Sequence, residues 1–235
     1  MQIILGGGCF WCLQGCFELL PNINSVTCGY AGGLTQNPTY EEVCSGKTGH
    51  IEVVLIDYSE PRDNFSPNNN HKDSSKSPKN FDTKNKEKSG EKTQNNLENN
   101  HLQNLGQLNN VDKNPDLKNS HSTLEQILDL FWQIHNPTTL NQQGADIGSQ
   151  YASAIFWQNT EQLEIINQTL EKLKNSGKYQ NQIVTKIEQK VDFSTTFWKA
   201  IEKHQNYFAK NPNQGYCQIV VLPKIQKTKK LLQID

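Results

Sequence analysis

The chain has 235 residues and a formal net charge of −1 at pH 7, so its composition gives no reason to expect nucleic acid or an anionic membrane as a partner. No apolar run approaches the ~18 residues of a transmembrane helix, and the first residues lack the basic start of a secretory signal. We therefore expect a cytoplasmic protein. Its six cysteines are too few for a disulfide scaffold, and in a reducing compartment they indicate catalysis or metal binding.

The first 61 residues are expected to alternate strands with one helix. "QIILG" at 2–6 is typical of a short strand, and further strands are predicted at "SVTCGYAGG" (25–33) and "HIEVVLIDY" (50–58). Between the first two strands, apolar side chains recur at spacings of three and four and predict an amphipathic helix that ends at Pro21: Phe10, Leu13, Phe17 and Leu20.

Residues 62–121 differ sharply from the rest, because they are rich in Asn, Lys and Ser and contain no Cys, Trp or Tyr. Such a segment cannot bury enough apolar area to offset the entropy of ordering it. We predict a disordered insertion within a single domain formed by residues 1–61 and 122–235. An alternative is that the insertion is the functional part and that the protein acts in interactions through it.

After the insertion, Ser122 and Glu125 have the spacing of a capping box before a predicted helix over 123–134. "SAIFW" at 153–157 predicts a buried strand, and leucine and isoleucine spacing predicts a second helix that Gly177 ends. A strand at "QIVTKI", a partial helix over 193–208 and a turn-rich tail complete the chain. These elements indicate an α+β fold, a sheet covered on one side by helices.

Cys9 is the leading candidate for chemistry. It stands at the first turn of the predicted helix, where the helix dipole favours thiolate over thiol, and Phe10 and Trp11 would add an apolar wall. The alternatives are an ordinary helix-start cysteine, a dithiol centre made by Cys9 and Cys12, or half of a zinc site. Zinc is disfavoured, because the sequence has no second C-x-x-C and no H-x-x-x-H pair.

Other polar residues gather in two loops. Tyr30, Tyr40, Glu41 and Glu42 could line a pocket in which a shielded carboxyl would donate a proton, or they could belong to a solvated loop. Asp146, Gln150 and Tyr151 precede a strand, a common place for site residues. His135 is expected to interact with the carbonyls that end its helix, His204 is expected to be structural, and Cys217 lies in a tail that we predict to be mobile.

Several long motifs, in order, resemble the peptide methionine sulfoxide reductase A family. The matching stretches lie on both sides of the insertion: "GGCFW" at 7–11, "GYAGG" at 29–33, "NPTYEEVCSGKTGH" at 37–50, "FWQIHNPTTLNQQGADIGSQYASAIF" at 131–156 and "NPNQGYC" at 211–217. The resemblance implies a ferredoxin-like α/β sandwich with long irregular loops. It also implies reduction of the S epimer of methionine sulfoxide, free or in proteins, by a monomer that uses thioredoxin as reductant and no bound cofactor or metal.

The resemblance also implies roles for individual residues. Cys9 would be the nucleophile, and Phe10 and Trp11 would hold the substrate methyl group. Glu42 would protonate the sulfoxide oxygen, Tyr30 and Tyr151 would bind that oxygen, and Asp146 would support them. Cys217 would resolve the oxidised cysteine. The sequence departs from the family at Cys12, often glycine, and at Gln14, often glutamate. The first departure leaves open whether Cys12 or Cys217 is the resolving residue.

Overall fold

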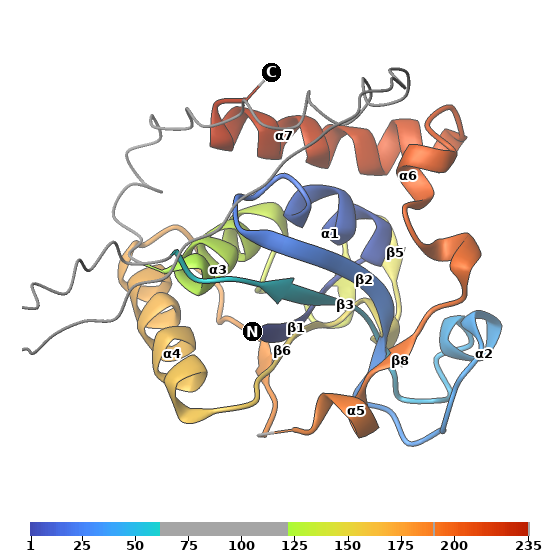
Figure 1. Cartoon of the computed structure of the whole chain (residues 1–235), viewed down its shortest axis with the longest axis horizontal. Coiled ribbons are helices and arrows are strands. Elements are labelled where there is room, and N and C mark those ends of the chain that lie inside the picture. Colours follow the sequence, from blue (N-terminus) through green and yellow to red (C-terminus); the bar gives the residue numbers. More distant parts are fainter. Residues whose placement is uncertain (62–121, 190, 235) are drawn as a thin grey trace, which may run out of the picture. The chain divides into compact units, whose positions relative to one another are not determined.

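The computed structural model describes residues 1–61, 122–189 and 191–234. Its centre is a six-stranded sheet with the order β7-β6-β1-β3-β2-β8 (Figure 1). Neighbouring strands are antiparallel, except that β6 and β7 are parallel. The strands are β1 Gln2–Gly7, β2 Ile23–Ala31, β3 Ile51–Tyr58, β6 Ser153–Phe156, β7 Lys186–Ile187 and β8 Trp198–Lys199. A separate ribbon pairs β4 Gln142–Gln143 with β5 Asp146–Ile147.

Helices cover one face of the sheet, as the apolar stripes predict. The main core includes Ile3 and Leu5 of β1 and Val54 of β3, which pack with the helices, whereas Ile4 belongs to a smaller cluster that also contains Phe193. This separation follows from the alternation of side chains along a strand. The helices are α1 Phe10–Phe17, α2 Tyr40–Cys44, α3 Thr123–Ile134, α4 Thr160–Asn175, α5 Phe193–Thr196, α6 Tyr207–Lys210 and α7 Leu222–Leu232.

The mixed α/β fold and the capping box are confirmed. Glu125 N–H donates to Ser122 Oγ, and Ser122 N–H donates to Glu125 Oε2, both at 3.2 Å. The predicted strand at 182–187 is only partly a strand, because β7 consists of Lys186 and Ile187. The predicted insertion at 62–121 lies outside the described residues. Within the part of the chain that is described, no helix is long and apolar enough to cross a membrane.

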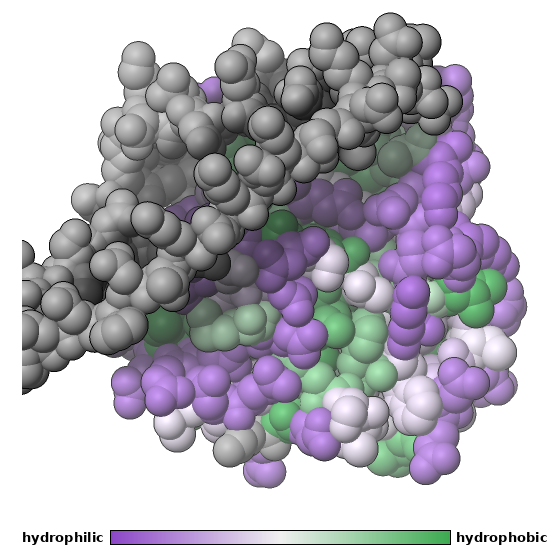
Figure 2. All heavy atoms as spheres, in the orientation of Figure 1, coloured by the Kyte–Doolittle hydropathy of each residue, from purple (hydrophilic) through white to green (hydrophobic). Residues whose placement is uncertain are grey.

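The predicted turn-rich stretch is present at residues 212–214, its mobility stays a prediction, and the helices that follow it were not predicted. Cys217 begins a π-helical turn, Cys217–Val221, and this turn leads directly into α7, which packs against α1 and α3 (Figure 1). Ile225, Thr228 and Leu232 recur along α7 and are buried. The helix escaped prediction because lysines alternate with these apolar positions and weaken the periodic signal. Figure 2 shows that the margin of the visible face is mostly hydrophilic, with hydrophobic residues near its middle.

His135 ends α3 as predicted. Its Nδ1 lies 2.6 Å from Phe131 O, and its Nε2 lies 2.7 Å from Ser153 Oγ. A neutral ring can donate to the carbonyl through Nδ1 and accept the hydroxyl proton through Nε2. Burial lowers the pKa of His135 from 6.5 to about 4, so the folded protein holds this ring neutral.

This pKa shift predicts an acid-sensitive stability. Below pH 6.5 the unfolded chain protonates His135 and the folded chain does not, so stability falls with pH until about pH 4. The loss attributable to His135 is about 3 kcal/mol. We expect the His135→Gln variant to be less stable than wild type at pH 7. Between pH 7 and pH 4, its free energy of unfolding should fall by about 3 kcal/mol less than that of wild type. Urea unfolding at a series of pH values measures the difference, and parallel curves would contradict the assignment.

Candidate active site

Cys9 lies between the end of β1 and the start of α1. It is the N-cap residue of α1, where its carbonyl accepts hydrogen bonds from Cys12 N–H (3.1 Å) and Leu13 N–H (3.3 Å). Gly8 makes the turn with φ +98°, and a Cβ at this position would lie 2.6 Å from the Gln143 side chain. A glycine is therefore required immediately before the candidate nucleophile.

The Cys9 thiol is buried, with 4% of the residue exposed. Burial raises its pKa well above the ordinary value, and the adjacent Cys12 thiol raises it further. Hydrogen bonds from the Tyr216 hydroxyl and from Cys12 N–H act in the opposite direction and are the smaller effect. The expectation that the helix start lowers the pKa is therefore wrong for this closed arrangement, in which Cys9 holds its proton.

Glu52 is the carboxyl beside Cys9. It lies on β3, is 1% exposed, and its Oε2 accepts the Phe10 N–H at 3.1 Å. Burial and then the proximity of Cys9 raise its pKa well above the usual value. Glu52 therefore keeps a proton at neutral pH and has the properties of a general acid. The signal in the sequence is a carboxyl near the start of the apolar run "HIEVVLIDY", a pattern that predicts a strand but not the role of Glu52.

Glu42, the acid that the resemblance suggested, lies in a different environment. It is the third residue of α2, and its exposed carboxylate accepts hydrogen bonds from Thr39 N–H (2.8 Å) and Thr39 Oγ1 (3.0 Å). These bonds lower its pKa, so Glu42 is ionised at neutral pH and has no proton to donate. The structure assigns Glu42 to a capping box, which stabilises the start of α2.

Three tyrosines surround the Glu52 carboxyl. Tyr30 pairs with Glu52 across β2 and β3 but is only 2% exposed, and its hydroxyl has no hydrogen-bond partner within the described structure. Tyr40 and Tyr151 are partly exposed. Burial raises the pKa of each tyrosine, and the nearby Glu52 contributes to each shift, so all three hydroxyls remain protonated donors.

Asp146 is brought to the site by the β4–β5 ribbon. Its Oδ2 accepts a hydrogen bond from the Tyr216 hydroxyl at 2.7 Å. Tyr216 also lies beside Cys9, which contributes to its raised pKa after burial, and its ring meets Trp11 edge-on at 5.9 Å. The sequence analysis did not single out Tyr216, because a tyrosine in a turn-rich segment carries no pattern that distinguishes it.

The predicted aromatic wall has two different members. Phe10 is fully buried and lies 5.8 Å from the Tyr30 ring. Trp11 is partly exposed and stacks on Tyr207, with ring centroids 3.8 Å apart and an interplanar angle of 9°. Both predicted residues thus lie at the site, but Trp11 is the one whose surface is accessible to a substrate.

Both candidate resolving cysteines are near Cys9. The Cys12 thiol is close enough to Cys9 to raise the pKa of Cys9, and burial followed by the charge of nearby Cys9 raises the pKa of Cys217. Both are buried, and all six cysteines are free thiols. In the ranges that the structure covers, no group of three or more His, Cys, Asp or Glu could hold a metal ion. The arrangement can therefore support thiol chemistry assisted by a proton donor.

Comparisons with known proteins identify the family. The family model for peptide methionine sulfoxide reductase matches residues 1–66 and 116–234. The peptide methionine sulfoxide reductase MsrA of Natronomonas pharaonis is 36% identical over 94% of this chain and 89% of its own length. The MsrA of Trichodesmium erythraeum is 35% identical over 97% of this chain and 93% of its own length.

Solved structures of such reductases share the fold. The reduced form of Mxr1 from Saccharomyces cerevisiae aligns with a TM-score of 0.59 and 24% identity, over 92% of this chain and 88% of that chain. Methionine sulfoxide reductase A of Corynebacterium diphtheriae aligns with a TM-score of 0.56 and 23% identity, over 91% of this chain and 76% of that chain. With the family model and the relatives in agreement, the chain belongs to the peptide methionine sulfoxide reductase family.

Proposed function

We propose that this chain reduces the S epimer of methionine sulfoxide, free or within oxidised proteins, and is recycled by thioredoxin. The observation that carries the proposal is the pairing of the buried Cys9 thiol with the buried, protonated Glu52 carboxyl at the start of α1. The family match supplies the substrate class. The proposal includes a cytoplasmic location, because thiols are kept reduced there, and a monomeric enzyme.

In the first step, the Cys9 sulfur attacks the sulfoxide sulfur and the S–O bond breaks. The oxygen leaves only if it is protonated, and we assign that proton to Glu52 in place of Glu42. Tyr40 and Tyr151 are half-buried hydroxyl donors beside Glu52 and would share the developing charge. Tyr30 is as buried as Glu52, pairs with it across β2 and β3, and has a hydroxyl without a partner in the described structure, so it would also bind the sulfoxide oxygen.

The oxygen takes one proton from Glu52 and one from the Cys9 thiol and leaves as water, so the Cys9 sulfur is now bonded to the methionine sulfur of a sulfonium. A water molecule then attacks the Cys9 sulfur and gives a proton to the Glu52 carboxylate. The S–S bond breaks, methionine leaves, and Cys9 is left as a sulfenic acid. A second thiol then condenses with the sulfenic acid, forming a disulfide and releasing water. We assign this step to Cys217, with Cys12 as the alternative, because both lie beside Cys9. Thioredoxin reduces the disulfide, so no bound cofactor is required.

The substrate methyl group would lie against Trp11, with Phe10 behind it and Tyr216 at its edge. An apolar contact of one methyl group is worth about 1–3 kcal/mol, which alone is too little for strict selection of one epimer. The fixed positions of Glu52, Tyr40, Tyr151 and Asp146 would add selectivity, because the S–O bond of only one epimer can point toward them.

Replacement of the nucleophile tests the proposal. Cys9→Ser is expected to release no methionine from the S epimer of a dabsylated methionine sulfoxide, and wild type is expected to release it with thioredoxin as reductant. Chromatographic separation of the two epimers measures both results. Retained activity in Cys9→Ser would refute the assignment.

One observation favours a second candidate function, a general dithiol oxidoreductase. The Cys9 and Cys12 thiols are neighbours at the start of α1, where Cys12 contributes to the raised pKa of Cys9 after burial, and such a pair can cycle between dithiol and disulfide. This function predicts reduction of insulin disulfides, which the reductase function does not. The interaction role of the insertion concerns residues 62–121, outside the described structure.

A further inference from the structure

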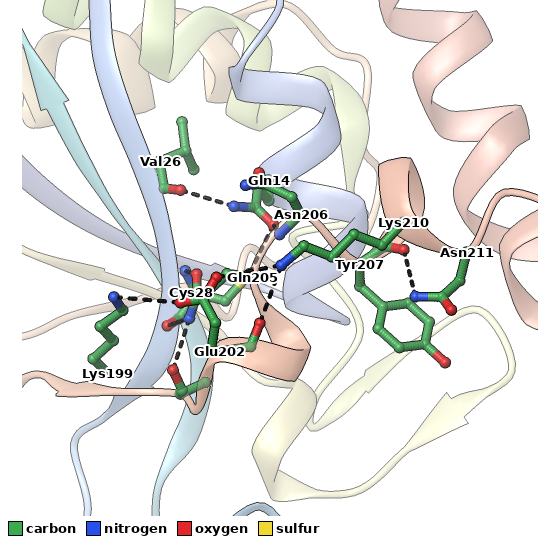
Figure 3. A network of polar contacts seen from close by, with 11 residues as sticks. Gln14, Val26, Cys28, Lys199, Glu202, Gln205, Asn206, Tyr207, Lys210 and Asn211 are labelled. Atoms are coloured by element: carbon green, nitrogen blue, oxygen red, sulfur yellow. Dashed lines mark hydrogen bonds and ion pairs between the residues drawn. The ribbon is translucent and has the colours of Figure 1, made fainter.

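A buried polar network joins the C-terminal part of the chain to α1 and β2 (Figure 3). Gln14 of α1 donates through Nε2 to Val26 O at 2.9 Å, and its Oε1 accepts Asn206 N–H at 2.9 Å and Cys28 Sγ–H at 3.3 Å. Gln14 is 3% exposed. One amide side chain thus joins three segments that are far apart in sequence.

Gln205 completes the network from the other side. Its Oε1 accepts Cys28 N–H at 2.9 Å, and its Nε2 donates to Cys28 O at 2.9 Å and to Ala200 O at 2.8 Å (Figure 3). The side-chain amide therefore pairs with both backbone groups of Cys28, as a residue of an adjacent strand would. It extends the β2–β8 ladder beyond Lys199, and Gln205 as a whole is only 6% exposed.

The two glutamines, which we call the amide clamp, fix the backbone between two aromatic residues. Asn206, held by Gln14, adopts the left-handed conformation at φ 53° and begins α6. In the sequence, His204 and Tyr207 lie on either side of Gln205 and Asn206. Tyr207 stacks on Trp11 at 3.8 Å, and His204 lies 5.8 Å from Trp11 at 21° and 4.4 Å from Tyr40. The clamp therefore determines where both rings meet the site.

Trp11 depends on these rings for its orientation. Its indole Nε1–H is buried and has no hydrogen-bond partner in the described part of the chain, so packing alone holds the ring. One face of the indole is occupied by Tyr207. A substrate methyl group can use only the remaining surface, and a shift of Tyr207 would change that surface.

We propose that Gln14 and Gln205 are positioning residues: they hold His204 and Tyr207 against Trp11 and thereby preset the wall on which the substrate methyl group binds. The proposal rests on the proposed function, since it concerns that same substrate. It involves no contact of either glutamine with the reacting atoms, so it predicts an effect on substrate binding and not on the chemical step.

The test measures single-turnover release of methionine from a peptide carrying the S epimer of methionine sulfoxide, over a range of peptide concentrations and without a reductant. Gln14→Leu removes the amide at similar volume. It should raise the half-saturating concentration by about tenfold and leave the rate at saturation within about twofold of wild type. The Trp11 fluorescence, taken as the difference between each protein and its Trp11→Phe counterpart, should change in parallel.

Gln14→Glu should restore the wild-type half-saturating concentration. A carboxyl group buried at this position keeps its proton, so it can donate to Val26 O and accept from Asn206 N–H. Thr169→Val is the matched control, because it removes a different buried hydrogen bond, from Trp132 Nε1 to Thr169 Oγ1 at 3.2 Å. It should lower the melting temperature and leave peptide binding unchanged.

Tyr207→Leu removes the stacking and leaves the clamp intact, so it should raise the half-saturating concentration even if Gln14→Leu does not fold. The proposal is overturned if both variants bind peptide as wild type does, if only the saturating rate falls, or if Thr169→Val weakens binding equally. If wild type itself releases no methionine, the proposed function fails instead, and the two failures are thus distinguished.

Discussion

Glu52→Gln is expected to slow methionine release in the first turnover by roughly 10²- to 10⁴-fold, the usual contribution of a general acid. The substitution preserves the volume of the side chain and an oxygen that can accept the Phe10 N–H at 3.1 Å. It removes the proton that the raised pKa of Glu52 retains at neutral pH. Rapid-quench measurement of methionine, with enzyme in excess over substrate, isolates this step from recycling.

Glu42→Gln is the matched control, since the chain offers a second carboxyl that the sequence alone favoured. Its amide oxygen can still accept the hydrogen bonds of Thr39 and maintain the start of α2. The first-turnover rate should therefore equal that of wild type. A slow Glu42→Gln together with a fast Glu52→Gln would restore the original assignment and refute ours.

The elements of the fold could be predicted where the local pattern decided the structure. The spacing of Phe10, Leu13 and Phe17 predicts α1, and the capping box of Ser122 and Glu125 predicts the start of α3. α7 was missed because lysines lie between its apolar positions and weaken the pattern; one of these positions, Ile225, lies against Gly15 of α1. Whether the fold is ferredoxin-like stays a prediction, and the family is confirmed.

The roles of Cys9 and of the acid both stay proposals, but the sequence singles out Cys9 more clearly than it does the acid. Cys9 stands out in sequence because glycines and aromatics surround it. Glu42 and Glu52 cannot be distinguished without the fold, because burial separates them: one is a surface cap with a lowered pKa, and the other lies beneath α1 with a raised pKa. Sequence spacing specifies neither which strand faces Cys9 nor which loop is exposed.

Burial also determines the direction in which the pKa of Cys9 is shifted. At a solvated helix start the dipole would dominate, but in this structure the loss of hydration outweighs it. Burial and then the nearby charge of Cys9 raise the pKa of Glu52. Neutrality of the pair is consistent with a proton that moves only when the sulfoxide oxygen arrives to receive it.

Cys217→Ser is expected to release about one equivalent of methionine per enzyme and then to stop, even with excess thioredoxin. The first step needs only Cys9, so the burst remains. A disulfide between Cys9 and Cys12 could still form, because the two thiols are neighbours at the start of α1. Burial does not separate the candidates, since Cys12 is 1% and Cys217 is 0% exposed, so the expected arrest rests on our assignment of Cys217 as the thiol whose disulfide thioredoxin reduces.

Cys12→Ser is the matched variant, and it should retain most of the multiple-turnover rate with thioredoxin. Peptide mass mapping after one equivalent of substrate should find Cys9 joined to Cys217 in wild type and in Cys12→Ser. It should find Cys9 joined to Cys12 in Cys217→Ser. Sustained cycling in Cys217→Ser, with arrest in Cys12→Ser, would instead identify Cys12 as the resolving residue, because only a thiol that thioredoxin can regenerate supports repeated turnover.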